Sequence, residues 1–374
     1  MVMIKVLSVF GTRPEAIKMC PLVKEMEGCS EIESIVCITA QHRQMLDQVL
    51  EVFEIKPDYD LNVMSDCQTL FDITAKVICG LKEVIEKSRP DIILVHGDTT
   101  TSFAAALAAF YCKVPVGHVE AGLRTYDKYS PFPEEMNRTL TGDIAELHFS
   151  PTEQNKENLL KENISRNIFV TGNTVIDAFK TTVKKNYQFE NEELNQLPFA
   201  EKQFVLMTAH RRENLGKPLE NICNAVLELA GKYSNLHFVY PVHLNPAVRE
   251  TVFRILGNKK NISLIDPISV TDMHNMMARS FLVMTDSGGL QEEAPYFGIP
   301  VLVLRTETER PEAVEMGTVR VVGIEKDDIV AAARTLIDNP GEYDKMAKAV
   351  NPYGDGHASE RIISAILERA KEEK

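Results

Sequence analysis

The chain has 374 residues, of which 44% are hydrophobic and 25% are charged, as is ordinary for a globular protein. That length is long for one hydrophobic core and about right for two. The formal net charge of −13 argues against nucleic acid or an anionic membrane as a partner, because no basic excess is available to neutralise phosphates.

Hydropathy and cysteine content predict the cellular location of the protein. No apolar run reaches the roughly 18 to 20 residues that a membrane span needs, which indicates a soluble protein. The seven cysteines form no C-x-x-C pair, and this favours reduced core thiols over a disulfide framework. We therefore expect a cytoplasmic location.

Short β-rich apolar runs alternate with helical patterns along the whole chain, which predicts parallel βαβ units. The strands expected in the first half are Lys5–Phe10, Ser34–Thr39, Ile92–His96, Val114–His118, Leu147–Ser150 and Ile168–Val170. Those expected in the second half are Phe204–Thr208, His237–Tyr240, Ile262–Ile265, Phe281–Thr285, Val301–Leu304 and Val319–Val322. The fold class is α/β, with two doubly wound, Rossmann-like domains. Residues Tyr187–Lys202, rich in acidic and amide side chains, are the best candidate for a linker or a variable excursion.

Unusual polar clusters follow the carboxyl ends of the expected strands, where ligands bind in open α/β sheets. In the first half these clusters are Gly11–Glu15, His96–Thr99 and His118–Arg124. In the second half they are Ala209–Asn214, Pro241–His243, Asp286–Gly289 and Arg305–Glu307. Two sheets whose loop-bearing edges face each other would form a cleft between the domains, and both halves would contribute to it.

The segment Ser287-Gly288-Gly289 reads as the start of a helix. Free backbone N–H groups and the helix dipole favour an anion there by about 0.3–1 kcal/mol. Glycines also let the backbone approach a phosphate closely. Glu293, one turn further on, is placed to accept hydrogen bonds from two ribose hydroxyls. A plain serine N-cap, with glycines present for packing, is the alternative interpretation.

Cations at two other positions suit a phosphate or a carboxylate. Arg13 and Lys18 flank Pro14, which is well suited to the first turn of a helix. Arg310 lies in a charged segment beside Pro311. A solvated helix face is the alternative for these residues.

Three carboxylates follow the strands of the first half. Asp98 precedes a run of threonines, Glu120 lies between His118 and Arg124, and Glu134 follows a pair of prolines that set a turn. Helix capping explains each one singly, but three on strand-end loops of one domain are more than capping requires. Carboxylates that lie close together push their pKa values apart, which equips a site with an acid and a base.

Several expected signatures are missing from the sequence. No strand is followed by G-x-G-x-x-G, and no G-x-x-x-x-G-K-[ST] occurs, so neither a dinucleotide nor a P-loop fingerprint is present. No grouping has zinc spacing, and Asp58-Tyr59-Asp60 is interpreted as a structural loop. We expect neither a cofactor nor a metal.

A set of longer motifs runs through the chain. They are Val9–Glu15, His96–Thr99, Gly117–Arg124, Pro131–Arg138, Thr171–Asp177, His210–Asn214, Asp286–Pro295, Thr308–Glu312 and Asn351–Gly356. In these motifs the chain resembles the bacterial and archaeal non-hydrolysing UDP-N-acetylglucosamine 2-epimerases, a family with the GT-B glycosyltransferase-like fold. The resemblance implies interconversion of UDP-GlcNAc and UDP-ManNAc without a nicotinamide, by elimination of UDP to a 2-acetamidoglucal and its re-addition.

The resemblance also implies roles for single residues. Asp98, Glu120 and Glu134 resemble the acid/base carboxylates of the family, and His210 resembles the residue that assists UDP departure and return. The implied UDP-contacting set is Arg13, Lys18, Ser287, Gly288, Gly289, Glu293 and Arg310. Several family members need UDP-GlcNAc at a second, effector site, for which Gln41, His42, Gln44, Arg211 and His243 are the candidates here.

The implied architecture joins residues 1–180 and 354–374 in a domain that carries the carboxylates, and assigns residues 181–353 to UDP binding. Residues Ala358–Lys374 have helical periodicity and would cross back to the first domain, and the family suggests a homodimer. A GT-B glycosyltransferase, a hydrolysing epimerase that releases free ManNAc, and a non-enzymatic UDP-sugar sensor are the rival readings.

Overall fold

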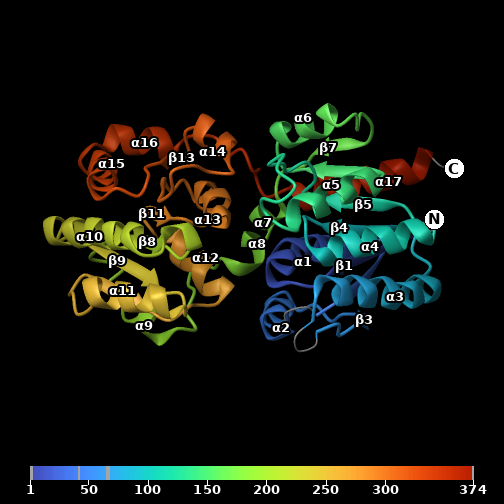
Figure 1. The fold of residues 1–374 in the computed structure, drawn as a ribbon, viewed down its shortest axis with the longest axis horizontal. Coiled ribbons are helices and arrows are strands. Elements are labelled where there is room, and N and C mark those ends of the chain that lie inside the picture. Colours follow the sequence, from blue (N-terminus) through green and yellow to red (C-terminus); the bar gives the residue numbers. More distant parts are fainter. Residues whose placement is uncertain (1–2, 41–42, 65–67, 373–374) are drawn as a thin grey trace. The chain divides into compact units, whose positions relative to one another are not determined.

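The structure is a computed structural model that describes residues 3–40, 43–64 and 68–372. The chain divides into two compact units, which are described separately (Figure 1). Unit 1 comprises Met1–Thr181 and Tyr353–Lys374, and unit 2 comprises Thr182–Pro352. The expected domain boundaries, after residues 180 and 353, each lie one residue from these. That the two units face each other across a cleft stays a prediction from the sequence.

Unit 1 contains a parallel sheet with the strand order β3-β2-β1-β4-β5-β6-β7. Its strands are β1 (Ile4–Phe10), β2 (Ile32–Ile38), β3 (Tyr59–Asp60), β4 (Ile92–His96), β5 (Val116–Val119), β6 (Leu147–Ser150) and β7 (Ile168–Val170). Its helices are α1 (Arg13–Glu27), α2 (Arg43–Val52), α3 (Leu70–Ser88), α4 (Thr100–Tyr111), α5 (Glu134–Ile144), α6 (Glu153–Lys161), α7 (Thr174–Asp177), α17 (Ala358–Glu372) and α8 (Phe179–Thr182), which crosses the unit boundary.

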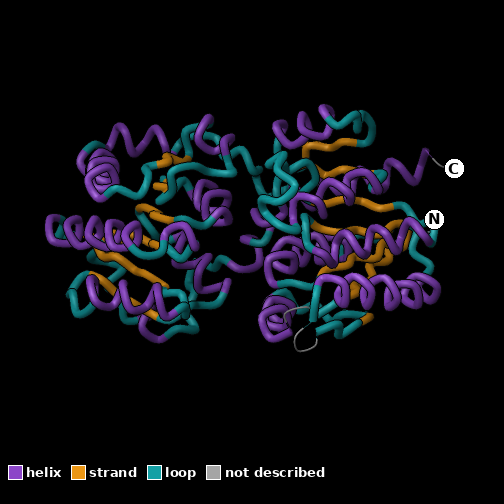
Figure 2. The backbone as a smooth tube through the Cα atoms, in the orientation of Figure 1, coloured by secondary structure: helices purple, strands orange, loops and turns teal. Residues whose placement is uncertain are grey.

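Unit 2 contains a second parallel sheet with the order β10-β9-β8-β11-β12-β13. Its strands are β8 (Gln203–Thr208), β9 (Leu236–Pro241), β10 (Ile262–Ile265), β11 (Leu282–Thr285), β12 (Val301–Val303) and β13 (Val319–Val321). Its helices are α9 (Glu192–Asn195), η1 (Arg212–Asn214), α10 (Lys217–Lys232), α11 (Pro246–Leu256), α12 (Val270–Ala278), α13 (Gly288–Glu293), η2 (Ala294–Phe297), α14 (Pro311–Glu315), α15 (Lys326–Asp338) and α16 (Pro340–Ala347). Figure 2 shows that helices flank the strands on both sides in each unit.

All twelve predicted strands are present, with ends that differ by at most two residues from the prediction. The α/β class and the doubly wound topology are thus confirmed. The expectation of a loop at Tyr59–Asp60 is wrong, because these residues form the two-residue edge strand β3, which pairs with Cys37 and Ile38 of β2. A strand of two residues at a sheet edge is too short to produce an apolar run in the sequence.

In both sheets the strand order reverses at a switch point, where a crevice opens beyond the carboxyl ends of two neighbouring strands. In unit 1 the switch point lies between β1 and β4, and in unit 2 it lies between β8 and β11. The polar clusters that follow these four strands therefore meet in pairs at the place where α/β sheets bind ligands. Within each unit, this confirms the positional argument made from the sequence.

The expectation of a linker at Tyr187–Lys202 is wrong. The phenol of Tyr187 donates a hydrogen bond to Asp272 over 3.0 Å. The Phe189 ring stacks on Phe199 at 5.7 Å, and the Arg279 guanidinium lies 4.7 Å from the centre of the Phe189 ring. The segment is part of unit 2, where Asn191 caps α9, and most of its other polar side chains are exposed. Its interpretation as a variable excursion stays a prediction.

The last helix returns to unit 1, as the sequence predicts. The buried carboxylate of Asp177 on α7 accepts hydrogen bonds from the backbone N–H groups of Ala358 and Ser359, at 3.2 and 2.8 Å. These bonds satisfy two of the donors that a helix start leaves unpaired. Asp177 thus fixes the start of α17 on unit 1.

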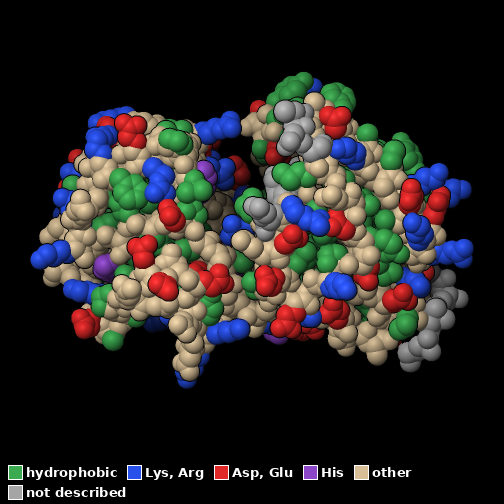
Figure 3. Space-filling view, turned by 90° about the horizontal axis from the view of Figure 1, so that it is seen from below, with side chains coloured by type: hydrophobic (Ala, Val, Ile, Leu, Met, Phe, Trp, Pro, Cys, Tyr) green, Lys and Arg blue, Asp and Glu red, His purple; other side chains and the backbone are tan. Residues whose placement is uncertain are grey.

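The distribution of surface charges and the free cysteines fit the expectations drawn from the composition. Acidic and basic side chains are interspersed on the face shown in Figure 3, without a continuous basic stretch. Among the described residues no helix is long and apolar enough to span a membrane. The cysteines in the described part of the chain are free thiols, and the cytoplasmic location expected from them stays a prediction.

Candidate active site

Helix α1 presents the two cations predicted after β1. Its N-cap residue, Thr12, forms a capping box with Glu15, and Pro14 lies in the first turn. Arg13 is the first helical residue, and Lys18 follows one and a half turns later. The Nζ atom of Lys18 forms an ion pair with the Glu120 carboxylate.

Glu120 follows strand β5 and lies almost buried, with 11% of its side chain exposed. Its φ of +63° is unusual for a residue other than glycine and is found at functional sites. Its Oε2 atom lies 3.2 Å from the Asn173 amide nitrogen and 3.3 Å from Nε2 of His96. Burial alone would raise the pKa of Glu120, but Lys18 and His96 outweigh burial and hold this pKa well below its usual range.

Asp98 follows strand β4 and has the opposite electrostatic setting. Arg138 on α5 donates a hydrogen bond to its carboxylate, and the Asn137 side-chain amide donates to its backbone carbonyl over 3.0 Å. Burial raises the pKa of Asp98 in spite of Arg138, and the charges of Glu120 and Glu134 add to the increase. The structure therefore places two neighbouring carboxylates in environments that move their pKa values in opposite directions, the arrangement that divides acid from base.

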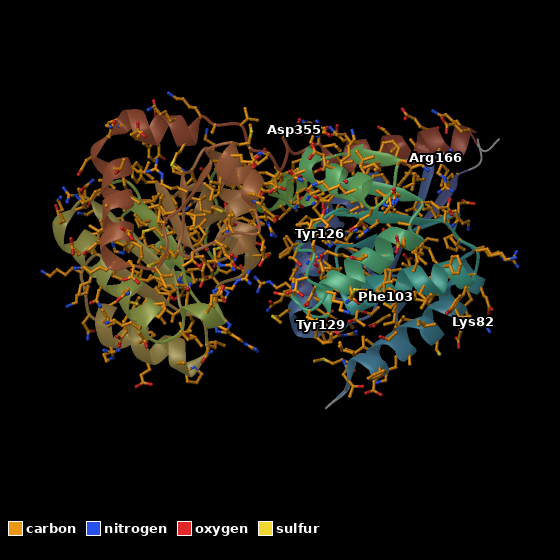
Figure 4. The ribbon with its side chains drawn as sticks, turned by 45° about the horizontal axis from the view of Figure 1, so that its top comes forward. Lys82, Phe103, Tyr126, Tyr129, Arg166 and Asp355 are labelled. Carbon is orange, nitrogen blue, oxygen red and sulfur yellow. The ribbon has the colours of Figure 1, made fainter. Side chains whose placement is uncertain are left out.

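Glu134 begins helix α5 and is half-buried. Within the described part of the chain its carboxylate has no hydrogen-bond or ion-pair partner, although it lies close enough to influence Asp98. The preceding turn contains cis peptide bonds before Pro131 and Pro133. This loop also carries Tyr126 and Tyr129, both exposed and labelled in Figure 4.

In unit 2, one carboxylate joins the loops that follow β8 and β11. Asp286 is fully buried, and its Oδ2 atom accepts hydrogen bonds from the backbone N–H groups of His210 and Arg211 at 2.7 and 2.8 Å. The Asn214 amide donates to the same oxygen over 3.0 Å. These bonds fix the backbone of the predicted catalytic histidine relative to the helix that follows Ser287.

The imidazole of His210 stacks on His243 with a centroid distance of 5.3 Å and an angle of 5° between the rings. Its Nδ1 atom lies 3.6 Å from Oδ1 of Asp286. Burial lowers the pKa of His210, the charges of His243 and Arg211 add to this effect, and Asp286 opposes it. A pKa below the ordinary value near 6.5 leaves the ring mostly neutral at pH 7, so it can both donate and accept a hydrogen bond.

Helix α13 begins at Gly288 with Ser287 as its N-cap residue, as predicted, and the Ser287 side chain makes no capping bond. Two guanidinium groups lie at this helix start. A Cβ atom placed on Gly288 would lie 3.4 Å from Nη2 of Arg310 and 3.9 Å from Nη2 of Arg211. Nε of Arg310 is hydrogen-bonded to Glu292. Cations and helical N–H groups together favour an anion here.

Glu293 lies beside the same glycines. Its Oε1 atom would be 3.2 Å from a Cβ placed on Gly289, and its Oε2 atom is 3.5 Å from Nε2 of the buried His274. His274 also shares a hydrogen bond of 2.8 Å with Thr182 through Nδ1. The carboxylate predicted to hold a ribose is thus fixed by a histidine that the sequence did not single out.

Two candidate effector residues, Arg211 and His243, lie in unit 2 directly beside residues predicted to serve the substrate. Gln41 and His42 lie outside the described residues, as does the side chain of Gln44. The effector site therefore stays a prediction.

Sequence reasoning gave no role to the residues that support the predicted site. They are Glu15, His96, Arg138, Asn173, His274 and Asp286. All but His274 lie in the polar clusters or motifs noted above, but their partners are distant in the sequence, so no local spacing indicates what they contact; the Thr-x-x-Glu pattern at Glu15 signals only a capping box.

No group of His, Cys, Asp and Glu among the described residues is arranged to hold a metal ion. The Asp-x-Asp sequence has structural partners instead. Oδ2 of Asp58 accepts a hydrogen bond from the Val36 backbone over 2.8 Å, and Asp60 forms an ion pair with Arg43.

Replacing Lys18 with Met should raise the pKa of Glu120, because the cation is lost while the burial remains. The measurement is a ¹³C NMR titration of glutamate carboxyl groups, with Glu120→Gln to assign the signal. Lys24→Met is the matched control, since Lys24 lies on the same helix and pairs with Glu27 at the surface. An unchanged Glu120 titration in Lys18→Met would contradict this electrostatic account.

Comparisons with known proteins cover nearly the whole chain. Residues 24–367 match the family model described as UDP-N-acetylglucosamine 2-epimerase. The UDP-N-acetylglucosamine 2-epimerase of Bacillus subtilis is 56% identical over 365 residues, which are 97% of this chain and 95% of the relative. The structure of UDP-GlcNAc 2-epimerase from Neisseria meningitidis bound to UDP-GlcNAc is 52% identical, with a TM-score of 0.88 over 98% of this chain and 100% of that chain. The Methanocaldococcus jannaschii UDP-GlcNAc 2-epimerase in complex with UDP-GlcNAc and UDP is 34% identical, with a TM-score of 0.78 over 98% of this chain and 100% of that chain.

These matches confirm the resemblance drawn from the motifs, and the two doubly wound units are those of a GT-B-like fold. The chain therefore belongs to the UDP-N-acetylglucosamine 2-epimerase family, and it is an isomerase.

Proposed function

We propose that the protein interconverts UDP-GlcNAc and UDP-ManNAc by eliminating UDP across C1 and C2 and adding it back with the C2 proton on the other face. The observation that carries this proposal is the pair of neighbouring carboxylates, Asp98 and Glu120, whose pKa values move in opposite directions. Inversion through a planar intermediate needs one group that accepts a proton and another that delivers one. The Neisseria relative, which binds UDP-GlcNAc, supports the substrate.

The chemistry of the sugar favours elimination. The C–H bond at C2 is not acidic, so direct removal of its proton is implausible. Oxidation of a neighbouring carbon would need a dinucleotide, for which the sequence has no fingerprint. Loss of UDP gives a 2-acetamidoglucal in which C2 is planar and open to protonation from either face.

We propose that unit 2 holds the nucleotide. The Arg310 guanidinium lies beside Gly288, so it would neutralise the diphosphate at the start of α13. Glu293 would accept hydrogen bonds from the ribose. The neutral imidazole of His210 would donate a hydrogen bond to the phosphate as the C1–O bond breaks.

We propose that unit 1 performs the proton transfers. Glu120, held ionised by Lys18, would accept a proton, and Asp98, whose pKa is raised, would deliver one. Glu134, which has no partner within the described part of the chain, would serve as the third acid/base group. Arg13 and Lys18 on α1 would contact the UDP, as the family resemblance implies.

Incubation with UDP-GlcNAc alone in D₂O tests this proposal. We expect UDP-ManNAc and UDP-GlcNAc that both carry deuterium at C2, measured by ¹H NMR. Asp98→Asn, Glu120→Gln and Glu134→Gln should each lower kcat by about 10²- to 10⁴-fold, the usual contribution of a positioned acid or base. UDP should still bind to all three variants, as measured by calorimetry, because the proposed nucleotide contacts of unit 2 are unchanged.

Near-normal turnover in all three variants would contradict the assignment of the carboxylates as acid/base groups. The same spectra separate the rival functions. A glycosyltransferase would leave C2 unlabelled, a hydrolysing epimerase would release free ManNAc, and a sensor would return the substrate unchanged.

We also propose that UDP-GlcNAc activates the enzyme at a second site that includes Arg211 and His243, with Gln41, His42 and Gln44. Arg211 and His243 lie next to the proposed substrate residues Gly288 and His210, so a second nucleotide sugar could influence them directly. Reactions started from pure UDP-ManNAc should then show a lag that a trace of UDP-GlcNAc removes. Hyperbolic kinetics without a lag would count against the effector site.

A homodimer is proposed through the exposed face of α3 and α4. This face carries Phe110 and Tyr111, with exposed fractions of 62% and 66%, beside a cavity of about 840 Å³. Lys82, Glu86 and Arg89 line the cavity, and charges of both signs can pair when a two-fold axis brings the same face together twice. Figure 4 shows Lys82 far from Tyr126 within unit 1, so such an interface would leave the candidate site accessible.

Light scattering should therefore give a mass of twice 42.0 kDa for the wild-type protein. Tyr111→Glu should halve this mass, whereas Val350→Glu, which changes an exposed apolar residue of unit 2, should not. A wild-type monomer would contradict the proposal.

A further inference from the structure

The Glu15 carboxylate is buried, with 2% of the residue exposed, and it accepts four hydrogen bonds. Its Oε2 atom accepts from the backbone N–H groups of Gly11 and Thr12, at 3.0 and 2.7 Å. Its Oε1 atom accepts from the hydroxyls of Thr99 and Ser102, at 2.7 and 3.0 Å. The two oxygens thus join the start of α1 to the start of α4.

Helix capping accounts for only half of this arrangement. Helix α3 begins with an equivalent capping box, in which Asp72 accepts from the backbone N–H and the hydroxyl of Thr69. That box is exposed, and within the described residues the Asp72 carboxylate bonds only to its own helix start. The Oε1 bonds of Glu15 have no counterpart there, so they serve something other than helix initiation.

The two helix starts joined by Glu15 support the two carboxylates of the candidate site. Helix α1 carries Lys18, whose ammonium contacts Glu120. Helix α4 is capped by Thr99, which directly follows Asp98. Glu15 is therefore connected to both carboxylates, through α1 on one side and through the start of α4 on the other.

A second series of contacts runs from Glu15 through Ser102 and His96 to Glu120. The one proton of the Ser102 hydroxyl is shared between Oε1 of Glu15 and the backbone carbonyl of His96, which lies 2.5 Å away, and Nε2 of His96 lies 3.3 Å from Glu120. Among the described residues, Lys18, His96 and Asp98 are charged or titratable groups that act on Glu120 or are acted on by it. Of these three residues, Lys18 lies on α1, whose start is capped by the box that includes Glu15. His96 and Asp98 lie at the end of β4, next to the start of α4.

We propose that Glu15 is a positioning residue for the epimerisation, which fixes the distance between Asp98 and the Lys18–Glu120 pair by joining α1 to α4. The inference rests on the proposed function, because it assigns the proton transfers to these carboxylates. Glu15 touches neither the substrate nor the reacting atoms. Misplacement of a reacting group by about 1 Å can cost about 10²-fold in rate, so a small movement of α1 relative to α4 would be visible in turnover.

Steady-state kinetics of Glu15→Ala, with Asp72→Ala as the matched capping control, tests the proposal. We expect Glu15→Ala to lower kcat by at least about 10-fold, in line with the rate cost of misplaced groups, and to change KM for UDP-GlcNAc much less. The acidic limb of the pH profile of kcat should move to higher pH, because a weaker contact with Lys18 lets the pKa of Glu120 rise. Asp72→Ala should lower only the melting temperature.

Glu15→Gln should recover most of the turnover. Its amide oxygen can accept from the two backbone N–H groups, and its NH₂ group can donate to the hydroxyls of Thr99 and Ser102. If Glu15→Ala does not fold, Ser102→Ala decides the question, since it removes one Oε1 bond and leaves the α1 capping box intact. It should lower kcat and shift the pH profile in the same direction.

A wild-type kcat and pH profile in Glu15→Ala, or in Ser102→Ala where Glu15→Ala does not fold, would overturn the inference even if the melting temperature falls. Failure of the proposed function is distinct from this result, because the wild-type protein itself would then place no deuterium at C2 of UDP-GlcNAc in D₂O.

Discussion

The ion pair between Lys18 and Glu120 joins the first helix of unit 1 to the end of its fifth strand. Burial alone would raise the pKa of both Asp98 and Glu120 and leave two similar acids side by side. Lys18 and His96 hold the pKa of Glu120 well below its usual range, while burial keeps the pKa of Asp98 raised in spite of Arg138. The proposed division between base and acid, and with it the proposed inversion at C2, depends on the contact between Lys18 and Glu120.

Both units contain a buried carboxylate that joins two loops, and we propose different roles for the loops in each unit. In each, one buried carboxylate joins the two loops at the switch point. Glu15 of unit 1 accepts hydrogen bonds from both loops, and Asp286 of unit 2, which lies on the loop after β11, accepts them from the loop after β8. In unit 1 this fixes the supports of two proposed acid/base groups. In unit 2 it fixes the backbone of His210 beside a helix start flanked by two arginines. A shared topology therefore supports the proposed proton transfer in one unit and the proposed anion binding in the other.

The sequence predicts the strands and the residue types at their ends well, because apolar runs and strand-end polar clusters are local signals. It fails where the cause is tertiary. The polar segment after Tyr187 looks like a linker until Arg279, far away in the chain, is seen to pack on Phe189. Likewise, nothing near Asp98 in the sequence indicates that Arg138 contacts it, or that Lys18 lies against Glu120. Motif resemblance identified the carboxylates, but their opposite pKa shifts could come only from the fold.

Positional isotope exchange tests most directly the central claim that UDP departs and returns. UDP-GlcNAc carrying ¹⁸O in the bridge between C1 and the β-phosphorus would be incubated with the protein and recovered. The account predicts that the label spreads into the non-bridging β-phosphate oxygens, seen as isotope shifts in ³¹P NMR, while deuterium from D₂O enters C2. Deuterium at C2 with the ¹⁸O still confined to the bridge would contradict it, because the C1–O bond would then never have broken.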